Sequence, residues 1–385
     1  MEPVSDINRR HTCADHTAPT NDRMRERTIG TKDSGRAGNS EDRLRLSGLS
    51  VGYRKHALLN DIRSSVAAGE LVALIGRNGT GKSTLMRTIA RLQPKLSGEM
   101  LLSGQTVEKF PKNQWAEKMS IVTTEAVHVS HLTVRRLVAF GRFPHTNWIG
   151  TLTGDDMAKI EEAMQLVGIT GLAEKNLHEI SDSERQRAMI ARTLAQDTDI
   201  ILLDEPTAFL DMPNKYELVR LLHRLTREKG KSILFSTHDL NIAVQEADKL
   251  WMIDRCRIYE GAPEDLALDG QLNRIFENRQ FHFDDASGEF SVRRDATVSV
   301  SLTGEGLPVV WTQKALERMG FLVKSCHTPC DAPFSVTVVG NRPAEWQLSC
   351  NGAVVRCKSI LELCRNIVAT GNGQRNDPDK SSPCR

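Results

Sequence analysis

The nine residues Gly76 to Thr84, with the sequence GRNGTGKST, constrain the fold of this chain more than any other feature. They follow an apolar run at 71–75 and precede a helical pattern of apolar residues at 85, 86, 89 and 92. A strand, a glycine-rich loop of the form G-x-x-x-x-G-K-[ST] and a helix make up the phosphate loop of nucleotide-binding α/β proteins. Glycine lets backbone N–H groups curl around a polyphosphate, and the helix N-terminus adds its positive dipole end. The loop therefore predicts a nucleotide site, in which Lys82 reaches the β- and γ-phosphates and Ser83 holds Mg²⁺.

Size and composition set the limits of the interpretation. A chain of 385 residues with 39% apolar and 26% charged residues can form two domains. The net charge of +2 gives no general argument for binding nucleic acid or an anionic membrane. There is no run of eighteen apolar residues, and no apolar segment follows Arg9 and Arg10 as a signal peptide requires. The eight cysteines are few for this length, so we expect reduced thiols and a cytoplasmic protein.

The pattern of residues divides the chain into four parts. Residues 1–42 are polar and aperiodic, and we expect them to be disordered, although an upstream start codon is an alternative. Strands alternate with helices over residues 43–270, which indicates a doubly wound α/β domain, and the segment 126–180 is an inserted helical subdomain. A small α+β domain follows at 285–369, and residues 370–385 read as a flexible tail.

Two further stretches carry candidate chemistry. The apolar strand at 200–203 ends in Asp204 and Glu205. A carboxylate at the tip of a buried strand beside a phosphate loop anchors Mg²⁺, so Asp204 is the predicted metal-side acid and Glu205 the general base that polarises water. Upstream, Ser181 and Glu184 match a capping box that starts a helix. That helix N-terminus is a second element able to face phosphate, although taken alone it is an ordinary helix start.

At this point the chain resembles the ATP-binding cassette (ABC) family over residues 43–270. The loop at 76–83 matches its Walker A motif, and residues 200–205 match Walker B with its catalytic glutamate. Ser181 falls on the serine of the L-S-G-G-Q signature, residues 208–211 resemble the D-loop, and residues 236–239 match the switch region. Five motifs in this order make the resemblance specific.

The resemblance implies a full set of roles. The expected catalytic residues are Glu205, His238 and Lys82, the histidine contacting the γ-phosphate. The expected ATP-binding residues are Tyr53, Gly76, Asn78, Gly79, Gly81, Lys82, Ser83, Thr84, Ser181 and Ser183, with the Tyr53 ring stacked on adenine. The expected Mg²⁺ ligands are Ser83, Asp204 and Glu125.

Two departures from the family pattern bear on catalysis. The two glycines of the signature are replaced by Asp182 and Ser183, and the Cβ of Ser183 can hinder the close backbone approach that glycine permits. Glu125 stands where the family has the Q-loop glutamine, and a carboxylate there adds charge beside the γ-phosphate. We expect weakened closure of the site rather than its loss.

The sequences of three segments resemble those of ATPases that energise uptake of iron-siderophore, haem or cobalamin: GRFPHT at 141–146, ARTLAQ at 191–196 and THDLN at 237–241. This resemblance implies a homodimer on the cytoplasmic face of the membrane, docked on two permease subunits that a substrate-binding protein supplies. The chain itself then touches neither the transported substrate nor nucleic acid. Two alternatives remain: a soluble ABC ATPase acting on ribosomes or DNA, and a nucleotide-binding regulator with weak catalysis.

The last hundred residues hold most of the cysteines. Cys326, His327 and Cys330, and further on Cys350, Cys357 and Cys364, have spacings that match no standard zinc pattern well. We therefore favour buried or incidental thiols over a metal site. No motif assigns a role to this domain.

Overall fold

The computed structural model describes residues 42–54, 56–123, 131–147, 149–208, 210–276, 281–284, 287–292, 298–325, 332–341, 343–350 and 352–374. The chain forms two compact units. The first comprises the residues up to Ile275 together with Asp284–Phe290, and the second comprises Phe276–Phe283 and the residues from Ser291 onward. The predicted disordered segment falls outside the described residues except for Asp42, where the first strand begins.

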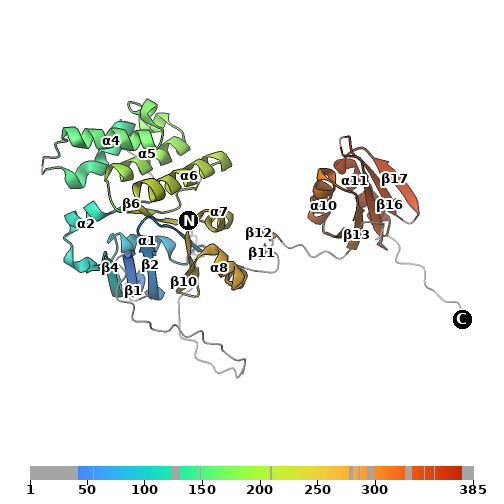
Figure 1. Cartoon of the computed structure of the whole chain (residues 1–385), viewed down its shortest axis with the longest axis horizontal. Helices are drawn as coiled ribbons and strands as arrows, with labels where there is room; N and C mark the ends of the chain where they lie inside the picture. Colours follow the sequence, from blue (N-terminus) through green and yellow to red (C-terminus); the bar gives the residue numbers. More distant parts are fainter. Residues whose placement is uncertain are drawn as a thin grey trace, which may run out of the picture. The chain divides into compact units, whose positions relative to one another are not determined.

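A six-stranded sheet forms the centre of the first unit (Figure 1). Its strands lie in the order β10 (Arg257–Gly261), β9 (Lys249–Asp254), β3 (Leu71–Gly76), β8 (Ser232–Ser236), β7 (Ile200–Leu203) and β6 (Met119–Val122). All neighbours are parallel except β10, which is antiparallel to β9. Every residue of β3, β7 and β8 is buried, as expected for a parallel sheet covered on both faces.

Helices cover this sheet. They are α1 (Lys82–Ile89), α2 (Lys112–Lys118), α6 (Met212–Lys229), α7 (Leu240–Glu246), α8 (Pro263–Leu268) and α9 (Gln271–Phe276). The apolar stripe of α6 is buried, and the helix ends before Gly230, whose φ of 61° is the left-handed conformation of a C-cap. The predicted strand–helix alternation is thus confirmed.

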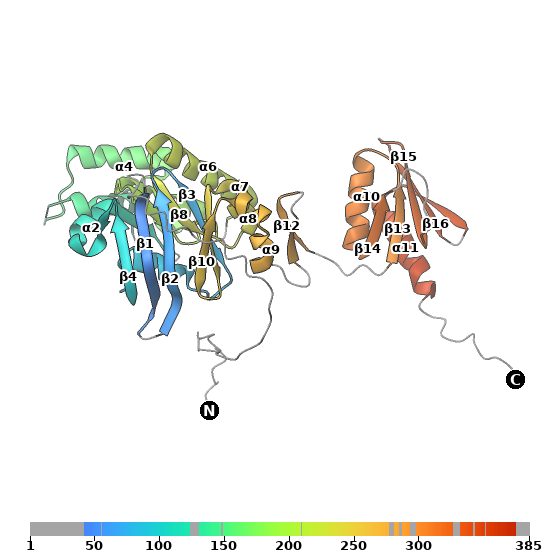
Figure 2. The same cartoon turned by 60° about the horizontal axis from the view of Figure 1, so that its bottom comes forward.

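A second sheet of the first unit is antiparallel, which the alternation of strands and helices does not predict. Its order is β2 (His56–Ala67), β1 (Asp42–Tyr53), β4 (Ser97–Leu102) and β5 (Gln105–Thr106), and Figure 2 shows β2, β1 and β4 side by side. Apolar residues of β1, β3 and α1 share one buried cluster, including Leu46, Leu74 and Leu85. The phosphate-loop helix is therefore held in a core to which both sheets contribute.

The predicted inserted subdomain, residues 126–180, is helical over its described residues. It contains α3 (Val134–Ala139) and α4 (Gly154–Leu166), with 3₁₀ turns η2 (Phe140–His145), η3 (Thr170–Leu172) and η4 (Leu177–Glu179). The next helix, α5 (Asp182–Ala195), begins beyond the predicted boundary and packs against α3 and α4, so the helical subdomain extends through it. The apolar residues Ile160 and Met164 of α4, and Val167 at its C-cap, are buried. Met157, which the helical spacing sets on the same face, is 42% exposed.

The second unit is a mixed sheet with two helices. Its strands β13 (Val298–Thr303), β14 (Phe321–Ser325), β15 (Phe334–Val339), β16 (Glu345–Cys350) and β17 (Ala353–Cys357) lie in the order β14-β13-β15-β16-β17. β13 is parallel to β14 and β15, and the other pairs are antiparallel. The helices are α10 (Leu307–Arg318) and α11 (Ile360–Gln374), and α11 extends into the segment predicted as a tail. A short hairpin, β11 (Phe281–Asp284) and β12 (Glu289–Val292), precedes the sheet in the chain.

The cysteines that the structure describes are of two kinds. Cys350, Cys357 and Cys364 are free, the first two are buried, and burial raises the pKa of the Cys364 thiol. Cys256 is disulfide-bonded, so the expectation of reduced thiols is wrong at that residue. Within the described ranges no cluster of three His, Cys, Asp or Glu could hold a metal, and Cys326, His327 and Cys330 lie outside them. In the same ranges no helix is both long and apolar enough to cross a membrane.

Candidate functional site

The phosphate loop connects β3 to α1 with an open helix N-terminus. Gly79 and Gly81 have φ values of 77° and 102°, a region that disfavours residues with a Cβ. Gly81 is the N-cap of α1, no side chain caps this helix, and no acidic residue lies in its first turn. The first amides of α1 are therefore available to an anion.

Lys82 lies folded against the loop. Its Nζ donates to the carbonyl oxygens of Gly76, at 2.8 Å, and Arg77, at 3.4 Å. Burial lowers the pKa of this ammonium, while the charges of Glu205 and Asp204 act in the opposite direction. The side chain is thus positioned at the loop with two carboxylates near enough to affect its charge.

The two predicted acidic residues are fixed by the neighbouring strand. Parallel pairing sets Leu203 of β7 opposite Phe235 of β8, so both strands end at the same edge of the sheet. There the Ser236 hydroxyl donates to Asp204 Oδ1, at 2.7 Å, and accepts from the Glu205 amide, at 2.8 Å. The sequence gives no role to Ser236, although a hydroxyl directly after a buried strand is the signal that could have suggested one.

Glu205 and His238 are in direct contact. His238 Nε2 lies 2.5 Å from Glu205 Oε1, and both side chains are partly open to solvent. Glu205 has φ of 51°, a conformation that is uncommon for a residue with a side chain and that the Ser236 bond helps to hold. The structure therefore places the predicted general base beside the predicted switch histidine.

Ser83 and Asp204 offer oxygen donors suited to Mg²⁺. The Asp204 side chain is almost fully buried, and one of its oxygens already accepts from Ser236. A buried carboxylate at this edge with no lysine or arginine ion pair among the described residues fits a site that a hard cation completes. The third predicted ligand, Glu125, lies outside the described residues.

Tyr53 is at the end of β1, close to the helix of the phosphate loop. Its hydroxyl forms a hydrogen bond of 3.1 Å with Thr84 Oγ1, and the residue is 56% exposed. The hydrogen bond holds the Tyr53 hydroxyl beside Thr84, in the first turn of α1. The face of the exposed aromatic ring remains available to stack on a planar base. The contact with Thr84 is not predictable from the sequence.

The Ser181 segment caps α5 as predicted. The Ser181 amide and hydroxyl both donate to Glu184 Oε2, at 2.8 and 2.9 Å, and these bonds lower the pKa of Glu184. Ser181 Oγ also shares a 3.1 Å hydrogen bond with Ser183 Oγ. Across the described part of the chain no hydrogen bond joins this segment to the phosphate loop. One chain therefore assembles the loop, Asp204, Glu205 and His238, and leaves Ser181 and Ser183 apart from them.

Two family models match the chain, one within each unit. A family model described as ABC transporter matches residues 59–208, and one described as iron ABC transporter C-terminal domain matches residues 297–368. An uncharacterised ABC transporter ATP-binding protein of Methanocaldococcus jannaschii is 37% identical over 254 residues, 66% of this chain and 87% of the relative. The ferric enterobactin transport ATP-binding protein FepC of Escherichia coli is 36% identical over 244 residues, 63% of this chain and 90% of the relative.

Solved structures share the fold of the first unit. One described as an inward-facing conformation of a putative metal-chelate type ABC transporter has a TM-score of 0.55 at 23% identity. The match covers 65% of this chain and 96% of that one. At this identity the likeness supports the fold alone.

Proposed function

The chain belongs to the ATP-binding subunits of ABC transporters, and we propose on that premise that it powers an importer of an iron complex (a siderophore or haem) or of cobalamin. Subunits of this family are ATPases, and this chain is one of them. The observation that carries the choice of cargo is the match of residues 297–368 to the iron ABC transporter C-terminal domain, together with a relative named for ferric enterobactin transport, FepC.

Different residues of the first unit have different roles in ATP hydrolysis. Lys82 and the free amides of α1 bind the β- and γ-phosphates of ATP. Glu205 accepts the proton of the attacking water, and His238, held against it, contacts the γ-phosphate and orients the carboxylate. Ser83 and Asp204 would hold Mg²⁺, which supplies neutralising charge at the phosphates. The Tyr53 ring stacks on the adenine.

A second copy of the chain completes the site. Ser181 and Ser183 lie at the capped N-terminus of α5, and both hydroxyls are at the surface. Since no hydrogen bond within the described chain brings them to the phosphate loop, we assign them to the ATP held by the partner chain in a homodimer. ATP then closes the dimer and hydrolysis reopens it.

The inserted subdomain provides the surface for a membrane permease. Four large apolar residues are exposed on it: Phe140 at 48%, Phe143 at 66%, Ile149 at 69% and Met157 at 42%. Exposed apolar residues grouped on one subdomain mark an interaction surface. The partner that fits is a permease pair fed by a substrate-binding protein, which places the ATPase at the cytoplasmic face of the membrane and away from the cargo.

Co-purification and uptake together test the proposal. The tagged chain is expressed in its native cells, and the detergent-solubilised membrane fraction is analysed for co-purifying proteins. We expect a permease, and we expect deletion of the chain to abolish accumulation of radiolabelled ferric siderophore, ferric haem or cobalamin. Recovery of ribosomes or DNA without a permease would favour the soluble ABC ATPase instead. Normal uptake of all three cargoes in the deletion strain would refute the importer.

A further inference from the structure

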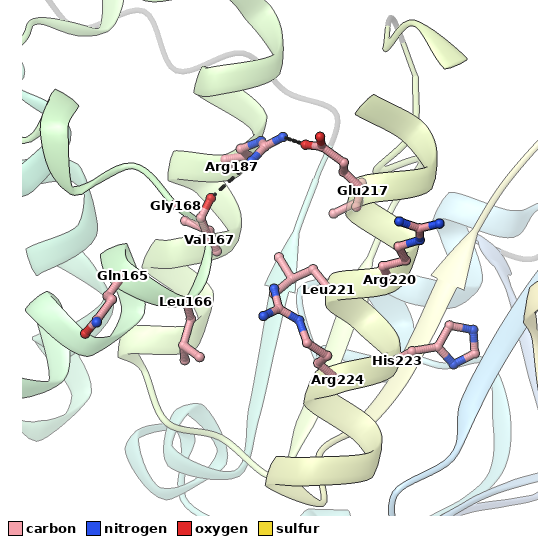
Figure 3. Close-up of a pocket in the computed structure, with 11 residues that line it drawn as sticks. Gln165, Leu166, Val167, Gly168, Arg187, Glu217, Arg220, Leu221, His223 and Arg224 are labelled. Atoms are coloured by element: carbon pink, nitrogen blue, oxygen red, sulfur yellow. Dashed lines mark hydrogen bonds and ion pairs between the residues drawn. The ribbon is translucent and has the colours of Figure 1, made fainter. Parts of the chain in front are cut away.

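A cleft of about 600 Å³ lies where the inserted subdomain meets α6 (Figure 3). One wall is the C-terminal end of α4 and the turn after it, residues 165–168, with Arg187 of α5. The other wall is the face of α6 from Glu217 to Arg224. The volume is within the range of about 300–1,000 Å³ typical of small-molecule sites. None of the predicted nucleotide-site residues lines this cleft.

The charge of the cleft is positive. Three arginines line it, Arg187, Arg220 and Arg224, against one carboxylate, Glu217, which gives a net charge of +2 from these groups (3 − 1). Arg187 is ion-paired with Glu217. Throughout the described ranges no carboxylate forms an ion pair with Arg220 or Arg224. Two guanidinium groups therefore have hydrogen-bond donors free for an anion.

The floor of the cleft is apolar. Leu218 and Leu221 are each only 5% exposed, and Val167 of the opposite wall is 3% exposed. In Figure 3, Leu221 and Arg224 extend from α6 toward Leu166 across the gap. The remaining ionisable group, His223, lies 3.1 Å from Glu246 Oε2 and points away from the gap, so it does not compete for a ligand.

We propose that this cleft binds a small amphipathic organic anion, with its apolar body on the leucine floor and its carboxylate or phosphate on Arg224 and Arg187, while Arg220 adds positive charge at the edge of the cleft. Inorganic phosphate alone leaves the floor in contact with water, and a neutral apolar molecule leaves two guanidinium groups without a partner. The arrangement of charge and apolar surface thus favours a ligand that has both parts.

The position of the cleft connects such a ligand to the ATP site. Arg187 is on α5, whose N-cap is Ser181, and Glu217 is on α6, whose N-cap is Asp211. Arg187 also donates to Asn214 Oδ1, at 3.4 Å, and Asn214 Nδ2 donates to Asp211 Oδ1, at 2.6 Å. An anion that competes with Glu217 for Arg187 changes the link between the signature helix and the D-loop helix. This regulatory consequence, unlike the binding itself, rests on the proposed function.

Calorimetric titration of the nucleotide-free full chain tests the binding. The probes are 2-naphthoate, 2-naphthyl phosphate, benzoate and inorganic phosphate. We expect one saturable site for at least one naphthyl anion that depends on Arg220 and Arg224, weaker binding of benzoate there, and no inorganic phosphate site that depends on these two arginines; phosphate bound at the phosphate loop is unaffected by their substitution. In the Arg220→Ala/Arg224→Ala double variant the affinity falls tenfold or more. The matched control is Arg257→Ala, which removes an exposed arginine of β10, far from the lining residues in sequence, and leaves the affinity unchanged.

The outcomes separate the hypotheses. Binding of either naphthyl anion that the double variant loses supports the site, and the preference between them identifies carboxylate or phosphate as the head group. No saturable binding of either naphthyl anion, or equal binding by the double variant, overturns the proposal. The ATP affinity of the double variant is measured in parallel, and a value equal to that of the wild type shows that the variant is folded. The titration does not depend on ATP hydrolysis. A failed titration would therefore refute the proposed ligand site but not the proposed transport function, and a failed uptake assay would refute the transport function but not the ligand site.

Discussion

The buried ion pair of Arg142 and Asp156 gives the most quantitative prediction. Arg142 of η2 donates through Nε to Asp156 Oδ1 of α4, at 2.8 Å, and through its terminal nitrogen to the carbonyl of Ala195 at the end of α5, at 2.8 Å. The two side chains are 6% and 5% exposed. The second oxygen of Asp156 accepts from the amide and hydroxyl of Thr153. One cluster thus joins α4 and η2 to α5, the helix whose N-cap is Ser181.

The pKa of Asp156 sets the scale of its contribution. Hydrogen bonds from the Thr153 backbone and side chain, and then from Arg142, lower this pKa from 3.8 to about 2. This lowering corresponds to about 2 kcal/mol of stabilisation, because a tenfold change in proton affinity is worth about 1.36 kcal/mol. Because the folded-state pKa is depressed, the stabilisation is present above pH 3.8 and is lost as the pH falls from 3.8 to about 2.

Substitution of Asp156 by Asn should therefore destabilise the inserted subdomain by at least about 2 kcal/mol at pH 7, since it also leaves Arg142 buried without its counter-charge. Hydrogen exchange measured by mass spectrometry reports this locally. Protection of α4 amides should fall about 30-fold, the equivalent of about 2 kcal/mol. Peptides of α11, in the second unit, are the internal reference and should not change.

Asp155→Asn is the matched control, because Asp155 is the neighbouring acid in the first turn of α4 and is exposed. Asp155→Asn should lower the free energy of unfolding by at most about 0.5–1 kcal/mol, because it removes only the interaction of the Asp155 carboxylate with the helix dipole. The difference between wild type and Asp156→Asn in thermal unfolding should persist from pH 7 to 5 and shrink by pH 3. Equal effects of the two substitutions, or a difference that does not shrink at pH 3, would refute the reasoning.

Three other substitutions test separate parts of the chain. Glu205→Gln should retain ATP and abolish steady-state phosphate release, because a carboxamide cannot accept the proton from water; turnover at the normal rate would remove Glu205 from its role. Ser183→Gly should raise turnover of the permease-bound ATPase, because it removes a Cβ from the surface that closes on ATP. Ser183→Ala keeps the Cβ and should not raise turnover. Robust turnover of the wild type would also eliminate the hypothesis of a weakly catalytic regulator. Thr312→Val should lower the free energy of unfolding of the second unit by about 1–3 kcal/mol, because the buried Trp346 Nε1 loses its acceptor at 2.7 Å. The control is Thr370→Val at an exposed position, whose unfolding temperature should match that of the wild type.

Features set by local chemistry were predictable from the sequence. The phosphate loop follows from glycine and lysine at fixed spacing, and β7 follows from four consecutive apolar residues before Asp204. The cap of α5 follows from Ser181 and Glu184, which need no distant partner. These segments carry enough information in about ten residues to specify their own conformation.

Features that depend on distant partners were not predictable. β10 is a five-residue edge strand with Arg257 and Glu260 in it, and β14 is an edge strand with no buried residue, so neither has the long buried apolar run of a central strand. The antiparallel sheet arises because β4 pairs with β1 across some fifty residues, from Ser50 to Ser97. The contacts of Ser236 with Asp204 and Glu205 likewise require β7 and β8 to be neighbours, which no local pattern states.

The two halves of the candidate site differ in how firmly they are held, and this difference bears on mechanism. Glu205 is constrained from three sides: by the Ser236 hydroxyl on its amide, by His238 on its carboxylate, and by its own left-handed backbone. Ser181 and Ser183 are constrained only within the first turn of α5. Because the catalytic half needs little reorganisation, the binding energy of ATP is available for bringing the partner's α5 to the γ-phosphate. The step most sensitive to substitution should therefore be closure of the dimer, which is where Ser183 replaces a glycine.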